Sequence, residues 1–80
     1  MLGINDLKTK KDVKTWFGQL VNEKKLNFHP DDDFNDFSSV LTKSEIDNYN
    51  KMMEKSFEIC GDDIYSLALE VAETWFSKLI

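Results

Sequence analysis

Residues 42–61 read TKSEIDNYNKMMEKSFEICG, and this stretch carries the signals for both ends of one long helix. Thr42 stands three residues before Glu45, which is a capping box: each side chain accepts a hydrogen bond from a backbone N–H that the first turn leaves without a partner. Gly61 follows the last apolar residue, where glycine is favoured because it adopts a left-handed conformation without strain. The sequence therefore predicts a helix over 43–60, with a stripe of apolar residues at helical spacing: Ile46, Tyr49, Met53, Phe57 and Cys60.

The segment before it predicts a second long helix, over about residues 10–25. Thr9 and Asp12 resemble another capping box, although aspartate is a weaker partner there than glutamate. Gly18 lies inside this helix at a cost of about 1 kcal/mol relative to alanine. It is either a tolerated glycine or the mark of a close helix crossing. The apolar residues all fall on one face of this helix: Val13, Trp16, Phe17, Leu20 and Val21.

The segment between these helices predicts a short helix over about residues 30–38. Pro30 suits the first position of a helix, and the three aspartates after it suit the positive end of the helix dipole. After Gly61, Asp62 or Asp63 is expected to cap a third long helix over about 63–79. We find no strand-like alternation, so the chain is expected to be all-α: a single domain, 1–80, forming a small bundle of three long helices (about 10–25, 43–60 and 63–79) plus the short one.

Composition excludes several classes of function. The chain has 80 residues and a net charge of −5, and all ten basic residues are lysine. Residues 1–25 carry +3 and residues 26–80 carry −8. Without arginine, and with a strongly acidic second part, direct binding of nucleic acid is not expected. No apolar run is long enough for a membrane span, and the single cysteine fits a cytoplasmic protein.

The lysines near the start of the first long helix are placed unfavourably. They lie where the helix dipole is positive, at a cost of about 0.3–1 kcal/mol each at low salt. Either they form a solvated face, or they dock onto the acidic part of this chain or onto an acidic partner. The four residues are Lys8, Lys10, Lys11 and Lys14.

The acidic segment after Leu26 is a candidate metal site. Asp31, Asp33 and Asn35 match three positions of a calcium-binding EF-hand loop, but the glycine and the bidentate glutamate that such a loop requires are missing. An acid-rich first turn of a helix explains the same residues without a metal. The weak candidate ligands are His29, Asp31, Asp33 and Asp36. No cofactor and no catalytic residues are expected, because neither a phosphate-binding glycine loop nor a nucleophile with its base is recognisable.

The last helix has more apolar surface than an edge helix needs. Ile64, Val71 and their neighbours fill one face, and a second set extends that face sideways. Either this is the central helix of the bundle, buried by both others, or the second set binds another chain, in a homodimer or in a complex with a different protein. The lateral residues are Tyr65, Leu69, Phe76 and Ile80.

One stretch resembles a group of short, uncharacterised bacterial proteins of gut anaerobes, often encoded in accessory or mobile regions of the genome. Their pattern is similar to F-H-P-D-x-x-F-x-D-[YF], then a threonine-capped helix ending in a cysteine-containing turn, then D-I-Y. The resemblance covers roughly residues 20–72, and it departs at Phe37, where tyrosine is commoner, and in a shorter connection before Thr42. It implies no activity; it implies that residues 29–37 form either a functional surface or a packing motif.

These observations favour a non-enzymatic protein-interaction module, an acidic accessory protein of the bacterial cytoplasm. The residues predicted to bind the partner are Tyr65, Leu69, Phe76 and Ile80, together with His29 and Asp32. One alternative is an acidic inhibitor that mimics nucleic acid and blocks a basic protein. A second alternative is weak binding of a divalent metal at residues 29–36.

Overall fold

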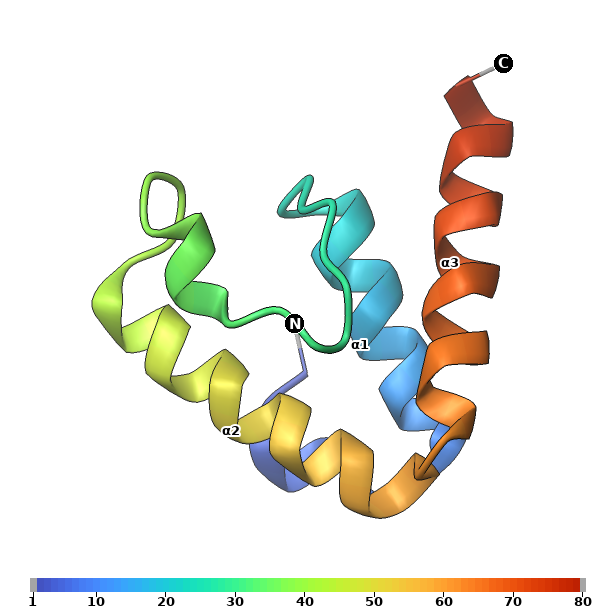
Figure 1. The fold of residues 1–80 in the computed structure, drawn as a ribbon, viewed down its shortest axis with the longest axis horizontal. Helices are drawn as coiled ribbons and strands as arrows, with labels where there is room; N and C mark the ends of the chain where they lie inside the picture. Colours follow the sequence, from blue (N-terminus) through green and yellow to red (C-terminus); the bar gives the residue numbers. More distant parts are fainter. Residues whose placement is uncertain (1, 80) are drawn as a thin grey trace.

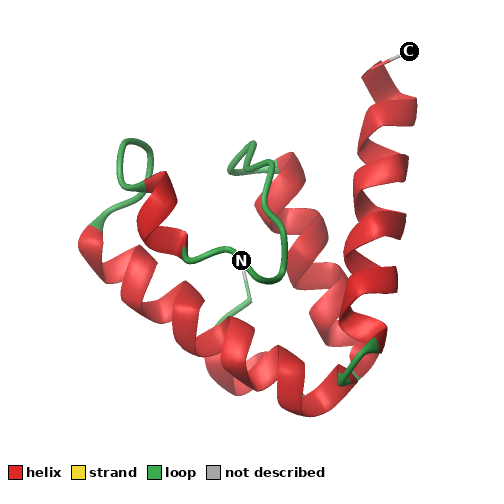
Figure 2. Cartoon of the chain, viewed as in Figure 1, coloured by secondary structure: helices red, strands yellow, loops and turns green. Residues whose placement is uncertain are grey.

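The computed structural model describes the backbone of residues 2–79 and the side chains of residues 2–73. The fold is all-helical as predicted: the described backbone contains helices, turns and loops and no strand (Figures 1 and 2). The five elements, in chain order, are η1 (Ile4–Asp6), α1 (Lys10–Asn22), η2 (Phe34–Phe37), α2 (Lys43–Cys60) and α3 (Asp63–Leu79), where η denotes a 3-10 helix.

Both predicted capping boxes are confirmed. The Thr42 N–H donates to Glu45 Oε1 at 3.0 Å, and the Glu45 N–H donates to the Thr42 hydroxyl at 3.1 Å. Thr9 and Asp12 form the same reciprocal pair at the start of α1, with distances of 3.0 and 3.3 Å. The hydrogen bonds from the backbone hold the pKa of Asp12 below its usual value. Each box fixes where its helix begins.

Gly61 ends α2 as the sequence predicts. Its φ is +57° and its N–H donates to the Phe57 carbonyl at 2.8 Å. Only Asp62 then separates Gly61 from the first residue of α3. The chain therefore turns from α2 into α3 within two residues, and this short joint decides which way α3 leaves the end of α2 (Figure 1).

The prediction of a helix over 30–38 is wrong in extent. Residues 30–32 form a turn instead, and the helical part is the 3-10 helix η2. Asp33 is its N-cap, because its carboxylate accepts from the Asn35 N–H at 2.9 Å, and the Phe34 N–H donates to Asn50 Oδ1 on α2 at 3.1 Å. The aspartate cap and the bond to α2 together start the helix four residues later than Pro30 suggests.

The first long helix also ends earlier than predicted, at Asn22 rather than at residue 25. Lys25 has a φ of +57°, and the reversal there lets the Leu26 N–H donate back to the Leu20 carbonyl at 3.1 Å. A lysine at positive φ is uncommon, so the pattern of residues gives no signal for this stop.

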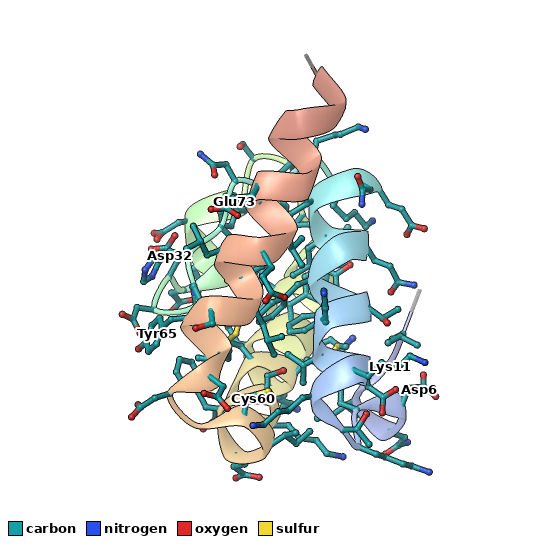
Figure 3. The ribbon with its side chains drawn as sticks, turned by 90° about the vertical axis from the view of Figure 1, so that its right-hand side faces the viewer. Asp6, Lys11, Asp32, Cys60, Tyr65 and Glu73 are labelled. Atoms are coloured by element: carbon teal, nitrogen blue, oxygen red, sulfur yellow. The ribbon has the colours of Figure 1, made fainter. Side chains whose placement is uncertain are left out.

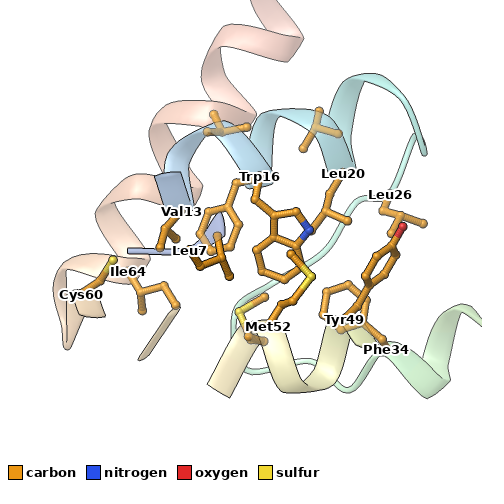
Figure 4. Close-up of a cluster of buried hydrophobic side chains, with 14 of the residues drawn as sticks. Leu7, Val13, Trp16, Leu20, Leu26, Phe34, Tyr49, Met52, Cys60 and Ile64 are labelled. Carbon is orange, nitrogen blue, oxygen red and sulfur yellow. The ribbon is translucent and has the colours of Figure 1, made fainter. Parts of the chain in front are cut away.

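The core is built around α1, whose apolar face is completely buried. Trp16 lies at its centre, with ring centroids 5.6 Å from Phe17 and 6.1 Å from both Phe34 and Tyr49 (Figure 4). Cys60 is buried, and this burial raises the pKa of its thiol. The buried apolar residues of α1 are the five predicted: Val13, Trp16, Phe17, Leu20 and Val21.

The segment before α1 adds to the core in a way that the sequence does not predict. Leu7, which follows η1, is completely buried. The Leu2 N–H donates to Gln19 Oε1 on α1 at 2.9 Å, and Lys55 Nζ on α2 donates to the Ile4 carbonyl at 3.1 Å. The first residues of the chain are thus tied to two helices.

α1, rather than α3, is the central helix. α1 buries its apolar face between α3 and α2, where Trp16 packs against Tyr49, whereas α3 packs mainly against α1 and meets α2 near the Gly61 joint (Figure 1). Gly18 marks no close crossing: a Cβ placed there would meet only the Asn22 amide of its own helix, at 3.9 Å. One side of α3 is therefore left without a covering helix in the described part of the chain.

Candidate functional site

A groove runs between α3 and the loop that follows α1. We call it the α3 groove. It encloses about 280 Å³, and it is lined by Phe28, His29, Pro30, Tyr65, Ala68, Leu69 and Ala72. It adjoins a narrower apolar hollow that shares Phe28, Ala68 and Ala72 and adds Val21, Lys25, Leu26 and Asn27.

The spacing of residues on α3 makes one wall of the groove. Tyr65, Leu69 and Ala72 recur at intervals of four and three, which places them on one face of a helix. Ala68 and Ala72 have no side chain beyond Cβ, so the surface is recessed between the larger residues. Leu69 remains 60% exposed and Tyr65 remains 40% exposed.

The opposite wall is the 26–32 loop, and core packing holds it in place. The ring of Phe28 lies 5.0 Å from that of Phe17, in an edge-to-face arrangement, and Pro30 is buried. A tight turn follows: the Asp32 N–H donates to the His29 carbonyl at 2.8 Å, and the His29 N–H donates to Asp32 Oδ2 at 3.0 Å. The wall is thus formed before any ligand arrives.

Tyr65 joins the two walls at one end of the groove. Its hydroxyl donates to Asp31 Oδ1 at 2.7 Å, and its ring centroid lies 5.8 Å from that of His29. The hydrogen bond to this carboxylate, followed by burial and the negative charge, raises the pKa of Tyr65. The ring also packs edge-to-face against Phe57 of α2, at 6.1 Å, so the position of Tyr65 is fixed from three sides.

Three of the six predicted partner-binding residues line this groove. Tyr65 and Leu69 come from α3, and His29 comes from the loop. Asp32 lies beside it in the turn that holds His29 (Figure 3). The other two, Phe76 and Ile80, lie outside the described side chains.

Three of the four predicted metal ligands, His29, Asp31 and Asp33, already accept hydrogen bonds from other residues of this chain. Asp33 Oδ1 accepts from the Asn35 N–H at 2.9 Å and from the side chains of Asn50 at 3.0 Å and Asn35 at 2.7 Å, and these bonds, the backbone one first, lower the pKa of Asp33. His29 Nδ1 lies 3.8 Å from Asp31 Oδ2. Among the side chains that the structure describes, no three histidine, cysteine or acidic residues lie close enough to hold a metal ion. Asp36, the last candidate, is exposed at the surface of η2.

Lysines of α1 dock onto the acidic part of the chain, as one of the two interpretations predicts. Lys10 pairs with Asp63, and Lys14 pairs with Glu70 at 3.2 Å. The hydrogen bond to Asp63, followed by the negative charge of Asp63, raises the pKa of Lys10. Several carboxylates of the acidic part are therefore balanced by lysines of the same molecule.

The sequence reasoning missed the residues that give the groove its shape. Ala68 and Ala72 are absent from the predicted partner-binding residues, yet both line the groove. Two small residues four apart beside a stripe of large ones are a usable signal for a recess. Phe28 and Pro30 carried no such signal, because a loop can be placed only after the fold is known.

Comparison of the chain with models of protein families, with characterised proteins and with solved structures finds no match. Of the helices described here, none combines the length and the apolar character needed to cross a membrane.

Proposed function

We propose that this protein is a non-enzymatic protein-interaction module that binds its partner in the α3 groove. The observation that carries the proposal is the exposure of Leu69 and Tyr65 beside an apolar recess, whereas α1 buries all its large apolar side chains and α2 leaves none as exposed as these two. Exposed apolar surface around a recess is typical of sites that bind proteins.

The energetics support binding at this place. Covering an exposed leucine contributes about 1.5–3 kcal/mol, and an aromatic residue such as Tyr65 with one polar end suits an interface. The walls are held by the Phe28 packing and by the Tyr65–Asp31 hydrogen bond, so little further ordering is required. A preformed site loses less conformational entropy on binding than a flexible one.

The proposal includes the finer features predicted from the sequence. The chain forms one domain, a small bundle of three long helices, and acts in the bacterial cytoplasm without a cofactor. Its single cysteine suits a reducing compartment, and two residues of the 29–37 segment to which the resemblance draws attention, His29 and Pro30, line the groove. The acidic-inhibitor alternative has less support, because Glu45, Asp63 and Glu70 pair with lysines of this chain.

Site-specific photo-crosslinking tests the proposal. A photoreactive phenylalanine analogue is placed at position 69 in the full chain and, as a matched control, at position 40. Val40 is 64% exposed, much like Leu69, but it is not among the residues that line the groove. We expect crosslinked protein adducts from position 69 that are absent from position 40. Equal adducts from both positions, or none from position 69, would contradict the proposal.

A further inference from the structure

The charges beside the α3 groove are unequal at its two ends. At the Tyr65 end, Asp31 and Asp32 are exposed in the loop. Tyr65 and Asp32 lie on the same side of α3 (Figure 3). Lys11 projects from the opposite side of the molecule in the same view. An apolar recess is therefore bordered by carboxylates at this end.

None of the described lysine side chains pairs with Asp31 or Asp32 at this end. Lys10 and Lys14 bind Asp63 and Glu70, between α1 and α3. Lys24 binds Glu45 at the start of α2, at 2.7 Å, and Lys25 lines the far, narrow end. Within the described side chains, no lysine lies at ion-pair distance from the aspartates at positions 31–33.

The charge distribution disfavours a second copy of the chain as the occupant. In a symmetric dimer, the same patch faces itself, so the two acidic rims would meet. Each chain also carries a net charge of −5. Like charges brought together at an interface weaken binding, whereas a basic partner gains from the same field.

We infer that the α3 groove binds an amphipathic, basic segment of a partner protein. A large apolar side chain of that segment packs between Phe28 and Leu69, and a lysine or arginine beside it pairs with Asp31 and Asp32. Arginine fits best, because its planar guanidinium can bind two carboxylate oxygens at once. This inference rests on the proposed function and adds the chemistry of the partner.

The test begins with a displayed library of random 16-residue peptides selected against the full-length protein. Enriched peptides are synthesised with a fluorescent label, and their affinities are measured by fluorescence anisotropy at low and high salt. We expect peptides of positive net charge that carry large apolar residues. Their binding should weaken as salt rises, because exposed charges are screened.

Two pairs of variants locate the binding site. Leu69→Ser should weaken binding by about tenfold or more, whereas Val40→Ser should leave it within about twofold. Asp31→Asn with Asp32→Asn should weaken binding several-fold and reduce its salt dependence. The asparagine amides keep the oxygen acceptors that hold the loop. The matched control, Asp47→Asn with Glu58→Gln, changes the same charge at exposed positions of α2 and should have little effect.

The outcomes separate this inference from the proposed function. Neutral or acidic peptides that lose affinity in Leu69→Ser would overturn the basic partner and leave the groove as the interaction site. An absence of enriched peptides, or peptides that bind Leu69→Ser as well as wild type, would overturn both. Analytical ultracentrifugation adds the third outcome. A dimer that Leu69→Ser abolishes and Val40→Ser retains would assign the groove to a second copy and overturn the inference.

Discussion

α1 and α3 are amphipathic helices that pack against each other, yet the apolar face of α1 is buried whereas that of α3 is partly exposed. Every large apolar side chain of α1 is buried. In the described part of α3, Ile64 and Val71 are buried, while Leu69 is 60% exposed and Tyr65 is 40% exposed. α1 carries a single apolar stripe, whereas α3 carries a wider apolar face, but the sequence alone does not say which part of that wider face is covered.

Position in the fold accounts for it. α1 lies between α3 and α2, whereas α3 packs mainly against α1 and meets α2 near the Gly61 joint (Figure 1), and a loop covers only part of its remaining apolar surface. The lesson is that an apolar face wider than one neighbour can cover becomes either core or binding surface, depending on what packs beside it. The contrast can be tested at four places, in order of decreasing effect. These are the buried face of α1, the Gly61 joint between α2 and α3, the Lys24–Glu45 ion pair between the end of α1 and α2, and the exposed face of α3.

The largest effect on stability is expected at Trp16, at the centre of the buried apolar face of α1. Trp16→Ala should reduce the free energy of unfolding by about 3–5 kcal/mol, through lost burial and a cavity. Urea unfolding followed by circular dichroism measures this change. A loss below about 1 kcal/mol would show that α1 is not the centre of the core.

Trp16→Phe sharpens this prediction and serves if the alanine variant does not fold. Among the described side chains, the Trp16 indole N–H is the one buried polar group without a hydrogen-bond partner. An unsatisfied buried donor costs about 1–3 kcal/mol, so removing it offsets part of the lost volume. Trp16→Phe should therefore cost much less than Trp16→Ala. Equal costs would mean that the indole N–H carries no penalty.

The next largest effect is expected at the joint that directs α3. Gly61 has a φ of +57° and a ψ of −137°, a conformation that residues with a side chain avoid. Gly61→Ala should cost about 1–3 kcal/mol of stability through backbone strain alone, because a Cβ there meets nothing within 4 Å.

Gly18→Ala is the matched control, and its expected sign is opposite. Gly18 is helical and its new Cβ would make only an ordinary contact, so the change should stabilise the protein by roughly 0.5–1 kcal/mol. The urea midpoints of both variants provide the measurement. A stable Gly61→Ala variant would show that the joint does not constrain the direction of α3.

The third prediction concerns the ion pair between Lys24, just after α1, and Glu45, in the first turn of α2. The hydrogen bond from Lys24, with that from the Thr42 N–H, lowers the pKa of Glu45 to about 2 from its usual 4.5. A carboxyl whose pKa is lowered by folding stabilises the fold above its usual pKa, and this contribution is lost as pH falls through the folded value.

Wild type should therefore lose stability as pH falls from about 4.5 to about 2, and Glu45→Gln should lose less over that window. Urea midpoints measured at several pH values test this. Glu58→Gln, at an exposed position on the same helix, is the control and should follow wild type. Parallel curves for Glu45→Gln and wild type would show that the interactions of Glu45 do not stabilise the fold.

The smallest effect on stability is expected at Leu69, on the exposed side of α3. Leu69→Ser should change the free energy of unfolding by no more than about 0.5 kcal/mol, because an exposed side chain contributes little to the fold. Val71→Ala, two residues away and buried, should cost clearly more. If both variants lose the same stability, Leu69 belongs to the core and the contrast between α1 and α3 disappears.

The local signals in the sequence predict the fold well where one residue type has one physical role. Thr9, Thr42 and Gly61 mark helix ends because their caps depend on neighbouring residues alone. The stop at Lys25 and the late start of η2 escape prediction, because each depends on a contact from elsewhere or on an uncommon backbone conformation. Leu7 is missed for the same reason: its burial is decided by helices far along the chain.

One wall of the candidate site could be predicted from the sequence, and the other could not. The spacing on the last helix identifies Tyr65 and Leu69 as a lateral face, since helical geometry relates residues four apart. The opposing wall requires the path of the 26–32 loop, which only the packing of Phe28 against Phe17 defines. His29 is predicted to bind the partner because it belongs to an acidic segment, whereas its contact with Tyr65 comes from the tertiary fold.

The hydrogen bond between Tyr65 and Asp31 has a thermodynamic consequence. It joins residues 34 positions apart, so the two walls of the groove are brought together only in the folded chain. A partner that needs both walls binds the native state and not the unfolded chain, and by mass action it raises the melting temperature. At a free concentration one hundred times its dissociation constant, such a partner adds about 2.7 kcal/mol of stability. Thermal unfolding with added candidate partners is therefore a screen that needs no label.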